Sequence, residues 1–203
     1  RKPVIWGLVQ CVLIGSLVYG VQKYWYKDYN FHKELAMNRA MEAGDWNGVI
    51  REAANLQDEP TRSIVMMKNL ALFRLGRLGD EAYHYRQGAK ASNTPIDIRM
   101  TQVVGRDIYF YFGQLNFCHR WCLEDGVEYG WRAVYLKYMI RCSLMDEEYE
   151  VAAKYINILK HTRYHQAWAE QQEQYLHHRE KLKASKEYGP LFPLRDFKDQ
   201  LSS

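Results

Sequence analysis

Apolar residues form one long run near the start of the chain and short periodic clusters elsewhere. Residues 4–21 read VIWGLVQCVLIGSLVYGV, in which Gln10 and Ser16 are the clearly polar members. At 1.5 Å per residue, a helix of about 18 residues spans about 27 Å, close to the hydrocarbon thickness of a bilayer. The pattern predicts a membrane-spanning helix, and the aromatic and basic residues at 23–27 are typical of its exit into the headgroups.

Two other interpretations of this run are less consistent with its length. A cleaved signal peptide has a shorter apolar region and small residues at its cleavage site, whereas bulky aromatics follow this run. A buried helix of a globular core usually keeps an apolar run to about 10–14 residues. Gly7, Cys11 and Gly15 recur every fourth residue, so they form a candidate face for packing against another helix. The alternative is that small residues are simply common in membrane helices.

From residue 30 onward the apolar positions follow helical spacing, and four segments repeat the order of helix, tight turn and second helix. The segments are 35–56, 64–89, 100–123 and 131–159, with turns at Gly44, Gly76, Gly113 and Glu147. Successive turns lie about 34 residues apart, a period typical of arrays of helix-turn-helix repeats. Pro60 and Pro95 fall between segments, where a proline ends a helix without removing an interior hydrogen bond.

Packing explains why such hairpins stack. A glycine at the turn accepts a positive φ, and small residues such as Ala53 and Ala152 let two helices approach closely. One hairpin cannot bury its apolar face alone, so neighbours stack into a solenoid. We expect an all-α chain with a transmembrane helix and its exit at 1–27, about four helix pairs at 28–188 and a tail at 189–203. Residues 164–188 are much more polar and are predicted to form a capping helix.

Several short stretches resemble tetratricopeptide repeats over roughly residues 31–160. The sequence GDWNGVI at 44–50 is similar to the turn of such a repeat, and NLALFRLG at 69–76 is similar to its first helix. Tyr149, Ala152 and Ala153 match positions of the second helix. The chain departs from the pattern around Gly79, at Cys118 where alanine is usual, and at the fourth turn, which lacks glycine. The resemblance implies a TPR-like array that holds a peptide or a partner helix.

The order of a spanning helix, an aromatic exit and a Gly-Asp-Trp turn also resembles an uncharacterised family of bacterial multi-spanning membrane proteins. In that family a helical-repeat region closes the chain. The resemblance carries no known activity, but it implies the inner membrane of a bacterium and other transmembrane helices as partners. The start at Arg1, without a methionine, is expected of a fragment. Basic residues after the span favour a cytoplasmic repeat region, but an upstream loop also enters that count, so the side stays open.

The net charge of +4 does not predict nucleic-acid binding once it is located. The first 27 residues contain Arg1, Lys2, Lys23 and Lys27 and no acidic residue, so the remaining 24 basic residues equal the 24 acidic ones. A nucleic-acid surface needs a strong excess of basic charge. The charge therefore belongs to the ends of the membrane helix, and we expect no nucleic-acid partner.

The candidate metal and redox patterns are weak. Cys118 and Cys122 are four residues apart, which matches neither a Cys-x-x-Cys redox pair nor a haem-attachment motif. They would share a helix face, yet a structural zinc site needs four ligands, so we interpret them as buried packing residues. His161 and His165 fall in a predicted loop, and His177 and His178 point in different directions. No catalytic residue, cofactor or metal is predicted.

The inner surface of a repeat solenoid, built mostly from the first helix of each pair, is the usual place for a peptide or partner helix. The candidate residues for this surface are Asn38, Arg74, Asp107, Tyr111, Lys137, Tyr138 and Arg141. We expect a membrane-anchored module that binds protein or peptide and assembles a complex. The alternative is the non-catalytic C-terminal region of a larger multi-spanning membrane enzyme, for example one that transfers sugars from lipid carriers. A third possibility is that the repeats only brace the membrane helix.

Overall fold

The described part of the chain is all-α. The computed structural model describes residues 2–25, 28–88 and 95–195, without the side chains of 2 and 95–103. Within these ranges the longer helices are α1 Lys2–Tyr24, α2 Tyr29–Glu42, α3 Trp46–Ala54, α4 Arg62–Arg74, α6 Pro95–Phe112, α7 Leu115–Tyr129, α8 Ala133–Met145, α9 Tyr149–Lys160 and α10 Gln166–Glu173. The shorter ones are α5 Leu78–Glu81, η1 Ala82–His84, α11 Arg179–Ala184, η2 Gly189–Leu191 and α12 Phe192–Arg195. Arg1 and Lys27, two of the four basic residues at the apolar run, lie outside the described residues.

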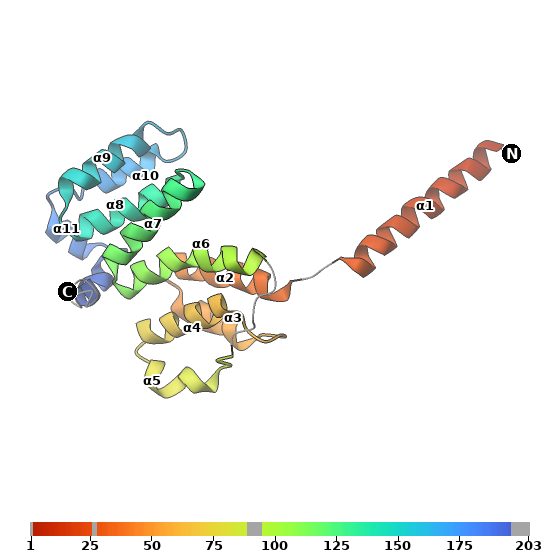
Figure 1. Cartoon of the computed structure of the whole chain (residues 1–203), viewed down its shortest axis with the longest axis horizontal. Helices are drawn as coiled ribbons and strands as arrows, with labels where there is room; N and C mark the ends of the chain where they lie inside the picture. Colours follow the sequence, from red (N-terminus) through yellow and green to blue (C-terminus); the bar gives the residue numbers. More distant parts are fainter. Residues whose placement is uncertain (1, 26–27, 89–94, 196–203) are drawn as a thin grey trace.

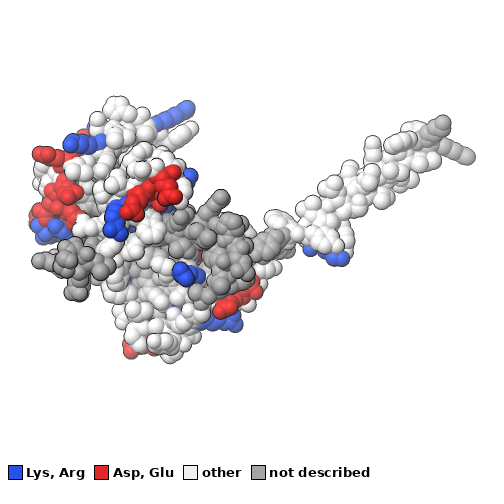
Figure 2. All heavy atoms as spheres, in the orientation of Figure 1, with Lys and Arg blue, Asp and Glu red and all other residues white. Residues whose placement is uncertain are grey.

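Helix α1 is long and apolar enough to cross a membrane. Its apolar stretch, Pro3–Tyr24, buries none of its surface in the rest of the protein. Figure 1 shows it apart from the other helices, and Figure 2 shows basic atoms towards its C-terminal end, where Lys23 lies in the last turn. The Ser16 hydroxyl donates a hydrogen bond to the carbonyl of Leu13 (2.8 Å), so this polar group is satisfied within the helix.

The helices that follow form four hairpins that pack in succession. The pairs are α2 with α3, α4 with α5, α6 with α7, and α8 with α9, and α10 packs on α9. Between pairs, α3 and α2 contact α4, α4 contacts α6, and α7 contacts α8. Figure 1 shows the second half of the array turned relative to the first. The chain is therefore an apolar N-terminal helix followed by a solenoid of four helix pairs with a cap.

The four turns are closed in the same way, as the spacing of the turn residues predicts. Gly44, Gly76, Gly113 and Glu147 all have φ between 65° and 90°. In each turn the next residue donates its N–H to a carbonyl five residues back: Asp45 to Ala40, Arg77 to Leu72, Gln114 to Tyr109, and Glu148 to Ser143. This hydrogen bond satisfies a free carbonyl at the end of the first helix. The second helix then begins one residue later.

Side-chain caps explain where α2, α3 and α4 begin. Asp28 accepts a hydrogen bond from the backbone N–H of Phe31, Asp45 from that of Gly48, and Thr61 from that of Ile64. Each cap satisfies one of the free N–H groups of a helix N-terminus and typically stabilises it by about 1 kcal/mol.

Two hydrophobic cores meet at α6. The first contains Met37, Val49 and Met67, and the second contains Cys118, Met139 and Leu144, all fully buried. Val104 near the middle of α6 belongs to the first core, and Phe110 two turns later belongs to the second. Because one helix supplies side chains to both cores, it joins the two halves of the array.

Two predicted elements differ from the structure. The second hairpin lacks a full second helix: α5 ends at Glu81 and continues only as η1, because Gly79 sits inside its first turn and weakens it. The polar segment 164–188 is not one helix but α10 and α11, interrupted at His177, which has φ of 61°. A positive φ at a non-glycine residue cannot continue a right-handed helix.

Residues 189–195, which the sequence analysis assigned to a tail, fold back onto the array. Leu191 is 1% exposed, and a side chain at Gly113 would meet Leu194 Cβ at 2.7 Å. Arg195 Nη1 lies 3.1 Å from Glu147 Oε1, and Arg195 Nε lies 3.6 Å from Asp146 Oδ1. The folded part of the chain thus extends at least to Arg195.

Candidate functional site

The seven residues predicted for the inner surface lie on the first helix of each hairpin. Asn38 is on α2, Arg74 on α4, Asp107 and Tyr111 on α6, and Lys137, Tyr138 and Arg141 on α8. We call the surface formed by these residues, together with Glu42, the first-helix face. Glu42 influences the titration of Asp107, Tyr111 and Lys137, which places α2, α6 and α8 in one electrostatic environment.

Arg74 joins the first two hairpins to the third. Its guanidinium lies 5.4 Å from the ring centre of Trp46, and that ring meets Tyr111 edge-on at 5.3 Å. Arg74 Nη1 also lies 3.5 Å from the carbonyl of Tyr111 and 3.2 Å from that of Pro190. Burial lowers the pKa of Arg74, and the Tyr111 hydroxyl partly offsets this. Desolvated cation–aromatic contacts of this kind stabilise by about 1–2 kcal/mol.

Asp107 and Tyr138 are buried beneath the surface, at 1% and 3% exposure, and cannot contact a partner directly. Burial raises the pKa of Asp107 to about 6, against the opposing effect of Arg106, whose Nε lies 4.0 Å from Asp107 Oδ1. Burial also raises the pKa of Tyr111, to about 12. Asp107, Tyr111 and Tyr138 therefore form the inner, polar layer of the first-helix face.

Arg141 holds the C-terminal segment against α8. Its Nε lies 2.7 Å from Glu187 Oε1, and its guanidinium lies 5.0 Å from the ring centre of Tyr138. Burial opposes the charged form of Arg141, but Glu187 acts together with Tyr138, Tyr188 and Tyr111, and their combined effect raises the pKa of Arg141. Lys137, one turn earlier, lies 5.0 Å from the Trp168 ring centre.

Sequence reasoning missed the segment that these arginines contact. Tyr188 is fully buried, and its hydroxyl hydrogen-bonds to Gln172 Oε1 (2.5 Å). Pro190 offers its carbonyl to Arg74, and Glu187 pairs with Arg141. The available signal was the run YGPLFPL at 188–194, an apolar stretch with two prolines in an otherwise polar C-terminal region.

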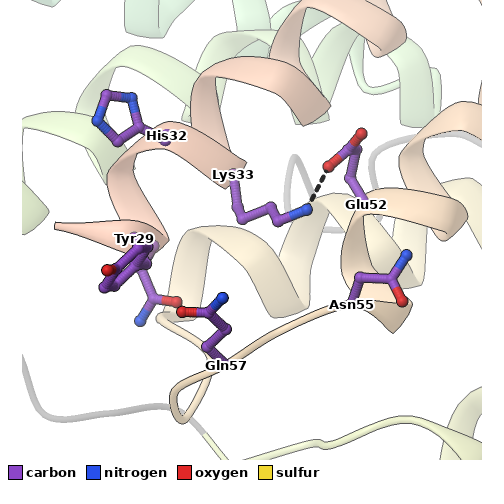
Figure 3. A pocket seen from close by; sticks show the side chains of 7 residues that line it. Tyr29, His32, Lys33, Glu52, Asn55 and Gln57 are labelled. Carbon is purple, nitrogen blue, oxygen red and sulfur yellow. Dashed lines mark hydrogen bonds and ion pairs between the residues drawn. The ribbon is translucent and has the colours of Figure 1, made fainter. Parts of the chain in front are cut away.

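A hollow of about 260 Å³ lies elsewhere, between the start of α2 and the end of α3. Tyr29, His32 and Lys33 contribute from α2, and Glu52, Asn55 and Gln57 contribute from α3 and the loop after it. Lys33 Nζ lies 2.6 Å from Glu52 Oε2, and Figure 3 shows this pair spanning the hollow while His32 turns away. No sequence motif marks this hollow, because its residues come from two helices and a loop.

Cys118 and Cys122 are buried packing residues, as predicted, and Cys142 is buried as well. Cys118, Cys122 and Cys142 are at most 1% exposed. Burial raises the pKa values of Cys118 and Cys142, and a hydrogen bond with Cys118 raises that of Cys122. Buried neutral thiols are poor nucleophiles and poor metal ligands.

The predicted histidine pairs are not arranged as a metal site. His161 and His165 fall in the loop between α9 and α10, and His161 Nδ1 lies 2.8 Å from the carbonyl of Asn157. His177 contacts the Tyr149 ring. Within the described residues, no group of three or more His, Cys, Asp or Glu side chains is placed to hold a metal ion.

The predicted packing face of α1 faces away from the rest of the protein. No atom lies within 4 Å of a side chain built at Gly7 or Gly15, and Cys11 is exposed. Any helix that packs there belongs to another span or another molecule.

Residues 2–203 match a family of unknown function (DUF6057), and the chain belongs to that family. No curated protein and no solved structure matches the chain.

Proposed function

We propose that this chain is a membrane-anchored helical-repeat module of the tetratricopeptide type that binds a polypeptide segment on its first-helix face. By this binding it assembles a complex at the membrane. It is a binding module with no reaction of its own. Three separate features support the proposal.

Support for the anchor comes from α1. A helix of 23 residues reaches about 35 Å, enough to cross a bilayer. Its exposed apolar side chains, including Trp6, Leu13 and Leu17, would be unfavourable in water. Lys23 lies within 5.8 Å of the Tyr19 and Tyr24 ring centres, an aromatic and basic pairing typical of membrane interfaces.

Support for a repeat array of the tetratricopeptide type comes from the shared turn geometry at Gly44, Gly76, Gly113 and Glu147. A period near 34 residues is characteristic of these repeats. The position two residues after each turn residue carries Trp46, Leu78, Leu115 and Tyr149, and each begins the second helix of its hairpin. The degenerate second hairpin is the weakest match.

The observation that carries the binding proposal is the contact between Arg74 and the main-chain carbonyl of Pro190. The first-helix face holds a stretch of the same polypeptide by a carbonyl at Arg74 and by a carboxylate at Arg141, while Tyr188 in that stretch is buried beside Gln172 and Tyr175. Recognition of a main-chain carbonyl together with anchor side chains is a usual way to bind peptides. The face therefore has the chemistry to hold a segment of another chain.

Asn38, Glu42 and Lys137 are groups of the first-helix face that remain partly or fully exposed. On α2, Asn38 Nδ2 lies 3.3 Å from Glu42 Oε1. The face thus offers a carboxylate, that of Glu42 on α2, and an ammonium group, that of Lys137 on α8. A partner segment with a basic residue for Glu42 and an acidic residue for Lys137 would complement this surface.

The test is site-specific photocrosslinking in native membranes. A benzoylphenylalanine placed at Lys137 probes the first-helix face, and one placed at Lys154, exposed on α9, serves as the matched control. We expect one protein crosslinked from position 137 but not from position 154, and its loss on reversal of charge at Arg74 and Arg141. The same products from both positions, or no product at 137, would contradict the proposal.

A further inference from the structure

This inference rests on the membrane anchor of the proposed function. With α1 in the membrane, the hollow at the start of α2 lies close to the membrane surface. Trp25 is the last described residue after α1, and α2 begins at Tyr29. Four residues reach at most about 14 Å even when fully extended. The headgroup layer is itself about 5–8 Å thick on each side of the hydrocarbon. Tyr29, Asn30 and Lys33 are therefore held at or just beyond the headgroups.

The topology places further interfacial residues on the same edge of the array. Because paired helices are antiparallel, the starts of first helices and the ends of second helices share the edge opposite the tight turns. In Figure 1 the loops after α7 and α9 lie together at the upper end of the second half of the array, and the start of α2 lies lower, on the side nearest α1. These loops carry Tyr129, Trp131 and Tyr164, which are 48%, 53% and 84% exposed. Exposed tyrosine and tryptophan are typical of surfaces that lie against headgroups.

The chemistry of the hollow is that of a paired cation and anion flanked by amides. Lys33 and Glu52 face each other, with 30% and 38% of their side chains exposed, so both remain within reach of a ligand. The carboxamides of Asn55 and Gln57 add donors and acceptors beside them (Figure 3). The hollow is smaller than most drug-sized pockets, which suits a compact polar group.

We propose that this hollow binds the headgroup of a zwitterionic phospholipid of the phosphoethanolamine class. The phosphate takes Lys33 and an amide N–H, and the ammonium group takes Glu52 and an amide oxygen. The ligand exchanges one internal ion pair for two external ones, so no charge is left without a partner. The bound headgroup fixes the first hairpin against the membrane surface.

The lining favours this headgroup over two other common ones. A choline group cannot donate hydrogen bonds to Glu52 and is normally held by several Trp, Tyr or Phe rings, whereas Tyr29 is the one such residue among those that line the hollow. An anionic headgroup such as phosphoglycerol has no positive group that could pair with the carboxylate of Glu52. Recognition of a primary ammonium next to a phosphate follows from the Lys33–Glu52 pair.

The experiment measures lipid retention by the full chain in detergent, using native mass spectrometry. Phosphatidylethanolamine, phosphatidylcholine and phosphatidylglycerol with identical acyl chains are compared on wild type and on a Lys33→Gln, Glu52→Gln variant. The matched control is Lys160→Gln, Glu173→Gln, which removes an ion pair of similar length (2.9 Å) and exposure (32% and 48%) from α9 and α10. Circular dichroism verifies that all three proteins keep the same helical content.

We expect wild type and the control to retain phosphatidylethanolamine about tenfold better than the other two lipids, and the Lys33, Glu52 variant to lose this preference. Equal retention of the three lipids, or an unchanged preference in the variant, overturns the proposal. Equal competition by phosphoethanolamine without acyl chains assigns the hollow to a soluble ligand and also overturns it.

Failure of the anchor is detected separately. In vesicles, Cys11 in the middle of α1 is protected from a water-soluble maleimide if α1 spans the bilayer. Reaction of Cys11 contradicts the membrane anchor itself, whereas loss of lipid preference with Cys11 protected contradicts only the headgroup site.

Discussion

Arg74 on α4 and Pro190 in η2 are 116 residues apart in sequence, yet the guanidinium of one lies 3.2 Å from the carbonyl of the other. The same guanidinium stacks on Trp46 and reaches the carbonyl of Tyr111. One side chain therefore connects the first, second and third hairpins to the C-terminal segment. Removing it should loosen a segment that is remote in sequence.

We predict that Arg74→Gln releases residues 186–195 locally. The variant loses a charge-assisted hydrogen bond and a cation–aromatic contact, which together stabilise by about 1–2 kcal/mol. Hydrogen exchange should show faster exchange in 186–195 with little change in α9. The control, Arg51→Gln, removes a pair with Asp45 in which the side chains are 69% and 49% exposed, so it should leave this segment unchanged. Uniform loss of protection in both variants would argue against the specific contact.

Two turn glycines provide a matched comparison of conformation and packing. Gly76 has φ of 70°, and a side chain there meets nothing within 4 Å, so Gly76→Ala should cost only the conformational term of about 1–2 kcal/mol. Gly113 has φ of 90°, but a side chain there meets Leu194 Cβ at 2.7 Å and its backbone at 3.0 Å. We therefore expect Gly113→Ala to lower the free energy of unfolding by about 1–3 kcal/mol more than Gly76→Ala does. Urea unfolding of the two variants measures the difference, and equal losses would mean that α12 does not pack on this turn.

Asp107 should make stability depend on pH. Its folded pKa of about 6 lies above the ordinary value near 3.8, because burial disfavours the carboxylate. The folded protein thus binds this proton more tightly than the unfolded chain does. The resulting stabilisation is complete below about pH 4 and is lost as the pH rises through 6.

Asp107→Asn removes this titration while keeping the shape of the side chain. We expect the unfolding free energy of wild type, relative to that of the variant, to fall by about 2–3 kcal/mol between pH 4 and pH 7. Urea unfolding followed by tryptophan fluorescence at several pH values measures this difference. A constant difference across this range would show that Asp107 has an ordinary pKa in the folded protein.

The fold was predictable because its signals are local. The turn between two helices, such as Gly44-Asp45-Trp46, depends on a few neighbouring residues, and the four equivalent turns recur at a regular period. The placement of candidate residues on first helices followed from the same period. The break at Gly79 was visible as a departure from the pattern, but whether the helix would survive it depended on packing.

The site was less predictable because its contacts are distant. Glu187 and Tyr188 read as the end of a polar helix, and only the folded chain brings them to Arg141 and Gln172. Asp107 is likewise buried beside Tyr138 of α8, and the sequence does not show this contact. The hollow at Lys33 and Glu52 combines two helices and a loop, and no spacing in the sequence signals it.

The most direct test of the binding face is a titration with a peptide that has the sequence of residues 185–195. The receptor is a chain that ends at Ala184, with helical content verified by circular dichroism, and the full chain serves as the self-occupied control. We predict saturable binding to the shorter chain, weaker binding to the full chain, and about 10- to 150-fold weaker binding of a peptide carrying Tyr188→Ala, because a buried tyrosine anchor contributes about 1.5–3 kcal/mol. Absence of saturable binding to the shorter, correctly folded chain would contradict a peptide-binding first-helix face.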